Sequence, residues 1–295
     1  MTEFAQFVLS GIALGAMYGL IALGFVIIYK ATEILNFAHG SLLLIGAYAV
    51  ARLSSWNFWL AILAGVTITV LIALGIERFL VRSMAGRTVI SITIMTIGLD
   101  VVLLTAARAQ VNTQILPLGD PWGSQMVRMG PLSIPMSRVA AIVVAGLILA
   151  AFLTWFRRSA WGIAFRAATE KREIAPLMGI RLDRLSAMAW GIAGGLAVVA
   201  GVFLSSFPSP GVNVDLASVA LRAFPAAVIG GLDSVHGAIV GGLMVGVAEV
   251  LAQGYQSNLQ FLGVGFHEVL TYALMILVLL FRPAGLFGSA AVNRA

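Results

Sequence analysis

Residues 157–184, RRSAWGIAFRAATEKREIAPLMGIRLDR, form the only long polar interruption in an otherwise apolar chain. The stretch carries seven of the eighteen Lys and Arg residues, and such residues concentrate in the cytoplasmic connections of membrane proteins. Its inner part, 166–180, mixes small, charged and apolar residues, is too short to be a domain, and places Gly179 where a helix C-cap would fall. We predict a cytoplasmic loop that contains a short helix lying on the membrane surface.

The composition of the whole chain excludes a water-soluble domain. Of its 295 residues, 60% are hydrophobic and 10% charged, and the mean hydropathy is +1.02. The net charge of +6 does not indicate nucleic-acid binding, because the basic residues are spread over connections without a basic face or interleaved aromatics. The absence of cysteine excludes disulfides, thiolate nucleophiles and cysteine metal sites, and only three histidines remain. We predict neither a metal nor a cofactor.

Apolar stretches of a length suited to crossing a bilayer recur along the chain. The first residues, MTEFAQF, lack a basic region, and no convincing cleavage site follows, so the first stretch is expected to be a retained span and not a signal peptide. We predict an all-α, polytopic transmembrane helix bundle of about eight spans, forming a single domain over 1–295. The spans are expected near 8–28, 40–53, 58–80, 89–108, 138–156 and 185–205, with a broken region at 216–252 and a last span that ends at Phe281, before Arg282 and Pro283.

The distribution of positive charge predicts the orientation. Thirteen of the eighteen Lys and Arg residues lie in connections on the same side as 157–184: the seven of that loop together with Lys30, Arg78, Arg82, Arg87, Arg282 and Arg294. The other five are Arg52, Arg108, Arg128, Arg138 and Arg222. The positive-inside rule therefore predicts an N-terminus outside and a cytoplasmic C-terminus. The connection 109–137, punctuated by Pro117, Pro121, Pro131, Pro135 and Gly119, is expected to be an ordered surface loop outside.

The region 216–252 has to enter the membrane and return, because both flanking connections lie outside in this topology. Gly230, Gly231 and Asp233 at its centre are expected to break it into two helices. Unwound backbone in a membrane is tolerated only where protein or a water-filled cavity covers it. We predict a re-entrant or helix–break–helix hairpin that lines a central pathway.

Two segments echo each other: NFAHGSLLLIGAY at 36–48 and DSVHGAIVGGLMV at 233–245. Each places a His-Gly pair at the start of a helix rich in small residues, as the halves of transporters often do, although chance matches are common in such a composition. An alternative is local: Asn36 caps a helix, and Asp233 and His236 satisfy free backbone groups at a break. The candidates for the translocation path are Asn36, Phe37, His39, Gly40, Gly230, Gly231, Asp233 and His236.

Glycines recur at a spacing of four in several spans, which predicts close helix packing. They include Gly11, Gly15 and Gly19 in the first span, and Gly237, Gly241, Gly242 and Gly246 in the broken region. Asp100 and Glu249 lie within apolar spans, where an ionisable residue is a candidate for substrate or proton handling or else pairs structurally.

Motifs for catalysis are missing. The chain has no phosphate-binding Gly-x-x-x-x-Gly-Lys loop and only two lysines, and His267-Glu268 lacks the second histidine of a zinc protease. Ser41 near His39 is a weak indication of a membrane hydrolase, since no Gly-x-Ser-x-Gly occurs. We predict that the protein is not an enzyme.

Four segments together resemble a known family: 11–50 (with NFAHG), 166–202, 223–251 and 275–288 (MILVLLFRPAGLFG). They are similar to the LivH-type permease of branched-chain amino acid ABC importers, over nearly the whole chain, with NFAHG and RPAGLFG the most specific pieces. The resemblance implies a multi-pass subunit of the bacterial inner membrane. It also implies, as partners, a LivM-type second permease, two cytoplasmic ATPases and a periplasmic substrate-binding protein.

In that family the loop between the fifth and sixth spans forms a coupling helix that docks into the ATPase. The resemblance assigns this role to Ala168, Glu170, Lys171, Ala175, Met178, Gly179 and Ile180. Pro176 departs from the family, which more usually has a helix former there, and its missing N–H is expected to kink the segment or delay its start.

The leading hypothesis is a permease subunit of an ATP-driven importer, most consistent with a branched-chain amino acid as substrate. Closure of the ATPases would push the coupling loops and switch the access of the cavity. The alternatives are an ABC permease for urea or amides, an ion-gradient-driven transporter coupled through Asp100 or Glu249, and a membrane hydrolase. The sequence shows no paired charges for the ammonium and carboxylate of an amino acid, and Tyr18, Phe37 and Tyr48 either line an apolar path or pack.

Overall fold

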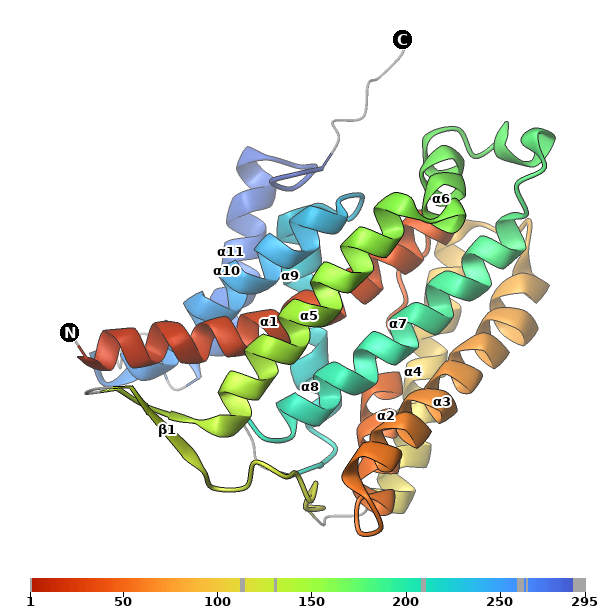
Figure 1. Ribbon diagram of the computed structural model, residues 1–295. Helices are drawn as coiled ribbons and strands as arrows, with labels where there is room; N and C mark the ends of the chain where they lie inside the picture. The colour runs from red at the N-terminus through yellow and green to blue at the C-terminus, as the bar shows by residue number, and fades with distance from the viewer. Residues whose placement is uncertain are drawn as a thin grey trace.

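The first helix, α1 (Thr2–Thr32), is the centre of the bundle in the computed structural model, which describes residues 2–111, 115–129, 132–207, 211–258, 263 and 265–288 (Figure 1). Over its most apolar window, 94% of α1 is buried. α10 (Val235–Gly254), α7 (Leu182–Leu204), α9 (Ala223–Gly230) and α5 (Met136–Arg158) pack around it. The helix is longer than the predicted span at 8–28, because it continues beyond the apolar stretch into polar residues at both ends.

Glycines set the contact between α1 and α10. A Cβ atom added at Gly246 would lie 2.2 Å from the backbone nitrogen of Gly15, and one added at Gly242 would lie 2.4 Å from that of Gly19. The two backbones therefore touch, which only glycine permits at these positions. The glycines spaced four residues apart in the sequence thus lie at the contact between the two central helices.

The remaining helices form the outer parts of the bundle. α2 (His39–Leu53) packs against α3 (Phe58–Ile76) and α7, and α3 continues through a π-helical turn, η1 (Glu77–Val81), and a 3₁₀ turn, η2 (Arg82–Met84). α4 (Val89–Val111) contacts α2 and is buried over only 11% of its apolar window. α11 (Phe266–Phe281) packs on α10 and α9.

Within the described residues, six helices are long and apolar enough to cross a membrane: α1, α3 with its two added turns, α4, α5, α7 and α10. Three shorter apolar helical stretches accompany them, at His39–Leu53, Leu216–Gly230 and Phe266–Phe281. The prediction of a polytopic helix bundle is therefore confirmed. The expected number of about eight spans is reached only if shorter apolar helices are counted together with the six long ones.

The connection 109–137 contains a β-hairpin that the sequence analysis does not predict. β1 (Met126–Met129) pairs antiparallel with β2 (Leu132–Pro135), with Met126 opposite Pro135. The all-α fold class is confirmed, and this hairpin is a local addition to it. It could not be predicted because strands of four residues are too short to show a clear alternation. Pro131 of that connection lies outside the described residues.

The broken region 216–252 forms α8 (Leu216–Leu221), α9 and α10. The expected break occurs after Gly230: Gly231 has a φ of +104°, and the Ser234 hydroxyl caps α10 by accepting from the Gly237 N–H at 3.0 Å. A further bend, at Arg222 between α8 and α9, is not predicted. The helix–break–helix form is therefore observed, but its turn lies at the end of the bundle, where the Lys30 ammonium donates to the Asp233 carbonyl at 2.6 Å.

Candidate functional site

The segment after α1 carries unwound backbone into the bundle. α1 ends at Thr32, Glu33 has a φ of +61°, and α2 does not begin until His39. A Cβ atom added at Gly24 would lie 2.7 Å from His39 Nε2. The His39 ring is therefore level with Gly24. Gly24 is eight residues before the end of α1, which is about 12 Å along the helix at 1.5 Å per residue. Residues 33–38 are the inward segment.

The predicted path residues at the start of α2 lie together and touch three other elements. The Phe37 N–H donates to the Thr96 hydroxyl of α4 at 3.2 Å, and the Phe37 ring lies 5.8 Å from that of Phe224 in α9. A Cβ atom at Gly40 would lie 2.7 Å from the Ala217 carbonyl oxygen of α8. The start of α2 therefore joins α4 to α8 and α9.

Several polar atoms in this region are buried without partners. Both ring nitrogens of His39 and the Asn36 side-chain nitrogen have no hydrogen-bond partner among the described residues, although the Asn36 oxygen accepts from the Ala38 N–H at 3.1 Å. An unpaired buried polar group costs about 1–3 kcal/mol.

Asp100, an ionisable residue in an apolar helix, pairs with Ser41. The Ser41 hydroxyl donates to the Asp100 carboxylate and lies 3.2 Å from the Asp100 carbonyl oxygen. The contact joins α2 to α4. Of the two roles considered for Asp100, substrate or proton handling and structural pairing, this contact corresponds to structural pairing.

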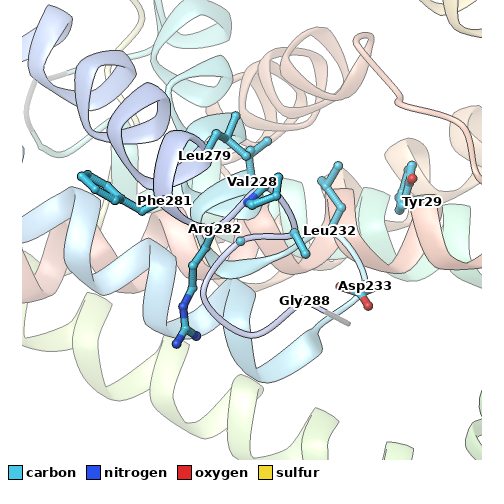
Figure 2. Close-up of a pocket in the computed structure, with 11 residues that line it drawn as sticks. Tyr29, Val228, Leu232, Asp233, Leu279, Phe281, Arg282 and Gly288 are labelled. Carbon is cyan, nitrogen blue, oxygen red and sulfur yellow. The ribbon is translucent and has the colours of Figure 1, made fainter. Parts of the chain in front are cut away.

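The other predicted path residues lie at the turn between α9 and α10. The His236 ring nitrogen Nε2 is 2.8 Å from Arg157 Nη2. The RPAGLFG segment folds over the turn, where the N–H groups of Leu286 and Phe287 donate to the carbonyls of Ile229 and Gly230 at 2.8 and 3.1 Å. A cavity of about 870 Å³ opens here, lined by Tyr29, Leu232, Asp233 and Arg282 among others (Figure 2). The structure thus separates this group from the residues at the start of α2.

Five cations from four separate connections lie at the same end of the bundle. The Arg172 guanidinium donates to the Ala31 carbonyl at 2.9 Å, and Arg82 Nη1 is 3.8 Å from the Asp183 carboxylate. We call this the basic end; its cations are Lys30, Arg82, Arg157, Arg172 and Arg282. Arg294, which was counted with them in the sequence, lies outside the described residues.

The loop 157–184 projects from the basic end as two short helices (Figure 1). α6 (Ala160–Glu170) is followed by the 3₁₀ helix η3 (Ala175–Met178), which Gly179 ends with a φ of +79°. Pro176 is in the first turn of η3, where its missing N–H is harmless. The expectation of one short helix over 166–180 is therefore wrong, because the loop breaks between Glu170 and Ala175.

Exposure divides the residues assigned to the coupling role. Ala168 and Ala175 are buried, Ile180 is half-buried, and Glu170, Lys171, Met178 and Gly179 are exposed. Two apolar residues that the resemblance did not include are also exposed, Ile174 by 47% and Leu177 by 84%, beside Met178 at 77%. We call Ile174, Leu177 and Met178 the η3 surface. Their spacing of three and four was a signal in the sequence that could have found them.

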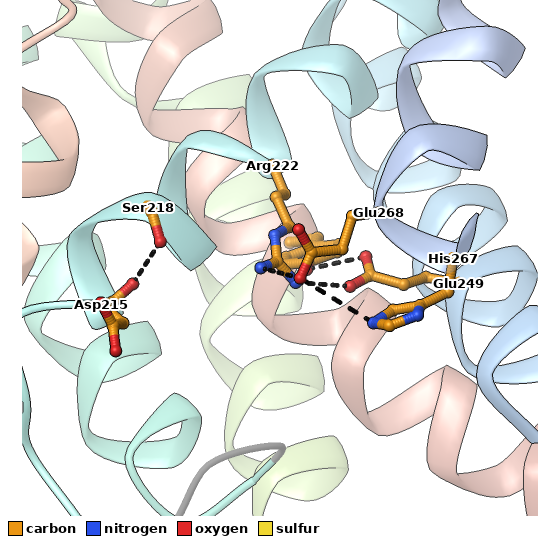
Figure 3. A network of polar contacts seen from close by, with 7 residues as sticks. Asp215, Ser218, Arg222, Glu249, His267 and Glu268 are labelled. Carbon is orange, nitrogen blue, oxygen red and sulfur yellow. Dashed lines mark hydrogen bonds and ion pairs between the residues drawn. The ribbon is translucent and has the colours of Figure 1, made fainter. Parts of the chain in front are cut away.

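A cluster of charged residues inside the bundle was missed. The Tyr18 hydroxyl donates to Glu249 at 2.8 Å, and Arg222 joins Glu249 at 3.2 Å to Glu268 at 2.7 Å, with His267 4.0 Å from Glu268 (Figure 3). Only Glu249 had been singled out as an ionisable residue. The residues of the cluster come from four places in the chain: α1, the bend between α8 and α9, α10, and α11. A local sequence pattern cannot predict contacts between residues so far apart in the chain.

A multi-pass bundle with a basic loop projecting from one end and an ion-pair cluster among its helices is typical of a membrane transport protein. The chain belongs to the family of branched-chain amino acid transport system permease components, whose model matches residues 7–279. It is thus a permease subunit of an ABC transporter, a transport component and not an enzyme.

Relatives match over nearly the whole chain. The high-affinity branched-chain amino acid transport system permease protein LivH of Salmonella typhimurium is 32% identical over 99% of this chain and 97% of its own length. BraD of Pseudomonas aeruginosa is 30% identical over 99% and 98%. A probable LivH of Methanocaldococcus jannaschii is 28% identical over 91% and 88%. A solved structure, PsaBC from Streptococcus pneumoniae in complex with Fab, matches at 14% identity with a TM-score of 0.47, too distant to support an argument.

Proposed function

We propose that the chain is one of two membrane subunits of an ATP-driven importer of the bacterial inner membrane. A LivM-type permease is its membrane partner, two cytoplasmic ATPases drive it, and a periplasmic binding protein delivers a branched-chain amino acid. The observation that carries this proposal is the η3 surface, three exposed apolar side chains on a loop that projects from the basic end. Apolar residues exposed outside the spans are typical of a surface that docks a partner.

Charge supports the orientation. Lys30, Arg82, Arg157, Arg172 and Arg282 lie together at the basic end although they come from four connections. The positive-inside rule favours a cytoplasmic position for that end. The N-terminus is then outside, and the C-terminus and the η3 surface face the ATPases.

Hydrogen bonds connect the loop to the central helix. Arg172 donates to the Ala31 carbonyl in the last turn of α1, and Arg166 donates to the Phe156 carbonyl of α5 at 2.8 Å. The inward segment follows Thr32 directly. We infer that a displacement of the loop by the ATPase is passed through Arg172 to the end of α1 and so to the start of α2.

The family relatives favour a branched-chain amino acid over urea or amides as the substrate. The ion-gradient alternative loses its candidates, because Asp100 is paired with Ser41, and Glu249 with Tyr18 and Arg222. Those contacts are the structural pairing expected of most carboxylates within spans.

Single cysteines introduced into this cysteine-free chain report its orientation. Ser83→Cys at the basic end and Ser124→Cys in the connection before β1 are both exposed. In intact spheroplasts a membrane-impermeant maleimide is expected to label Ser124→Cys at once and Ser83→Cys only after permeabilisation. The reverse pattern would refute the orientation.

Reconstitution tests the function itself. Proteoliposomes that contain both permeases and both ATPases, supplied with the binding protein, are expected to accumulate leucine only when ATP is present on the ATPase side. The purified chain alone is expected to accumulate none. Uptake by the chain alone, or uptake driven by an ion gradient without ATP, would contradict the proposal.

A further inference from the structure

The charged cluster around Arg222 (Figure 3) joins a buried carboxylate to an exposed one. Glu249 is only 3% exposed and is held by the Tyr18 hydroxyl at 2.8 Å and by Arg222 Nη1 at 3.2 Å. Glu268 is 51% exposed and is bound by Arg222 Nη2 at 2.7 Å. Arg222 thus presents one nitrogen to a fixed carboxylate and the other to a carboxylate at the surface of the bundle.

This surface is level with the middle of α1, where Tyr18 of the cluster lies. Glu268 is in the first turn of α11, which is shorter than the six candidate spans. α11 rises about 1.5 Å per residue, so Glu268 is about 20 Å along it from its end at Phe281, beside the basic end. Glu249 is about 8 Å before the end of α10 at Gly254 by the same rise. An exposed carboxylate at that depth is not expected to face lipid, because charged side chains within spans turn to protein or to a water-filled cavity.

The central helix pair is closely packed. α1 is almost wholly buried and meets α10 through glycine backbones. The face that carries Arg222 and Glu268 is open by contrast, since their side chains are 16% and 51% exposed. In the assembled importer, a second permease would cover that face from the other side.

From this arrangement we infer that Arg222 and Glu268 bind both charged groups of an α-amino acid zwitterion during its passage. The inference rests on the proposed function and specifies the substrate class. The substrate carboxylate takes the place of Glu268 at Arg222 Nη2, and the substrate ammonium binds the released Glu268 carboxylate. One ion pair is replaced by two, so no charge is left unpaired within the spans.

The surroundings favour this exchange. Glu249 and Tyr18 keep Arg222 in place when Glu268 moves, so they are positioning residues for the guanidinium. The cluster holds two carboxylates, Glu249 and Glu268, against the one guanidinium of Arg222, and this excess of carboxylates favours an arriving ammonium group. One turn beyond Glu268, the Thr271 hydroxyl is buried and has no hydrogen-bond partner among the described residues.

The exchange predicts selectivity for the zwitterion. Leucinamide carries the ammonium without a carboxylate, and 4-methylpentanoate carries the carboxylate without an ammonium. Leucinamide would leave Arg222 Nη2 without an acceptor, and 4-methylpentanoate would leave the Glu268 carboxylate without a partner, which is costly within the membrane. Both compounds are expected to bind at least tenfold more weakly than leucine.

The test uses the complete transporter in nanodiscs without its binding protein, so that only the membrane subunits select the ligand. Binding of radiolabelled leucine is measured, with leucinamide and 4-methylpentanoate as competitors. In Glu268→Gln the dissociation constant for leucine is expected to rise at least tenfold, because the partner of the ammonium is lost. The dissociation constant for 4-methylpentanoate is expected to fall, because no Glu268 charge is left unpaired when its carboxylate binds Arg222. Asp215→Asn removes an exposed carboxylate at the start of α8 and is expected to bind leucine as the wild type does.

A merely structural role for Glu268 predicts a different result, in which the variant weakens all three compounds equally and its melting temperature falls. That result would overturn the inference, as would wild-type transporter that binds no leucine or does not distinguish it from the two analogues. In each of these cases ATP-driven uptake by the reconstituted importer would leave the proposed function standing. Failure of ATP-driven uptake would instead refute the proposed function.

Discussion

Replacing Gly246 with leucine is expected to abolish the folded bundle. The first side-chain atom would lie 2.2 and 2.3 Å from the nitrogen and Cα of Gly15, and 2.9 Å from the Gly11 carbonyl oxygen. All three are backbone atoms of the buried central helix, so no side chain can move aside. Extra methylenes in a packed core typically cost about 1–3 kcal/mol, and a clash between backbones costs more because α1 and α10 must separate.

The measurement is the yield of monodisperse protein in size-exclusion chromatography, followed by the melting temperature in detergent. Gly146→Leu is the matched control, since a Cβ at Gly146 meets no atom within 4 Å and the residue is exposed on α5. The control is expected to behave as the wild type. A monodisperse Gly246→Leu protein with an unchanged melting temperature would show that α1 and α10 do not pack as described.

Leu177→Asp is expected to reduce ATP-driven uptake by more than tenfold in the assembled importer while the chain still folds. Leu177 is 84% exposed, so an aspartate there costs the isolated subunit little. In the complex, however, the same change would bury a charge in the apolar contact with the ATPase. The loss therefore belongs to coupling and not to stability.

Ser83→Asp places the same charge at another exposed position of the basic end, outside the η3 surface, and is expected to retain uptake. Uptake and ATP hydrolysis are measured in the same proteoliposomes, together with the melting temperature of each subunit. Equal uptake in Leu177→Asp and wild type would remove the η3 surface from the coupling mechanism.

Features with a strong local signal could be predicted from the sequence. The apolar stretches predict helices α3, α4, α5 and α7, because crossing a bilayer requires long runs of apolar residues. Gly179 ends η3 with a positive φ, and Gly231 marks the break before α10, since both conformations favour glycine. The charge of 157–184 likewise identifies the loop that projects from the bundle.

Features that depend on distant contacts could not be predicted. Arg222 was assigned to an outside connection, because nothing local shows that a bend between α8 and α9 brings it to Glu249 and Glu268. Glu268 was considered only as part of an absent zinc motif. The sequence shows no paired charges for an amino acid, whereas the structure brings Arg222 and Glu268 to 2.7 Å from each other.

The inward segment shows the same limit. The sequence located unwound backbone at Gly230 to Asp233, whereas the chain enters the bundle at residues 33–38, before NFAHG is complete. Glycines predict where a helix can break but not how deep the break lies, which depends on where α1 ends. His39 and Asn36 were singled out, yet their missing hydrogen bonds become visible only once α1, α2 and α7 are packed.

The central claim is that the ATPases drive this subunit through the η3 surface. Cross-linking of Leu177→Cys within the complete importer tests it most directly, because the chain has no other cysteine. A short bis-maleimide is expected to join this cysteine to an engineered cysteine on the facing surface of the ATPase and to stop ATP-driven uptake, while Ser83→Cys forms no such adduct. Absence of the adduct in a transporter that imports leucine with ATP would contradict the account.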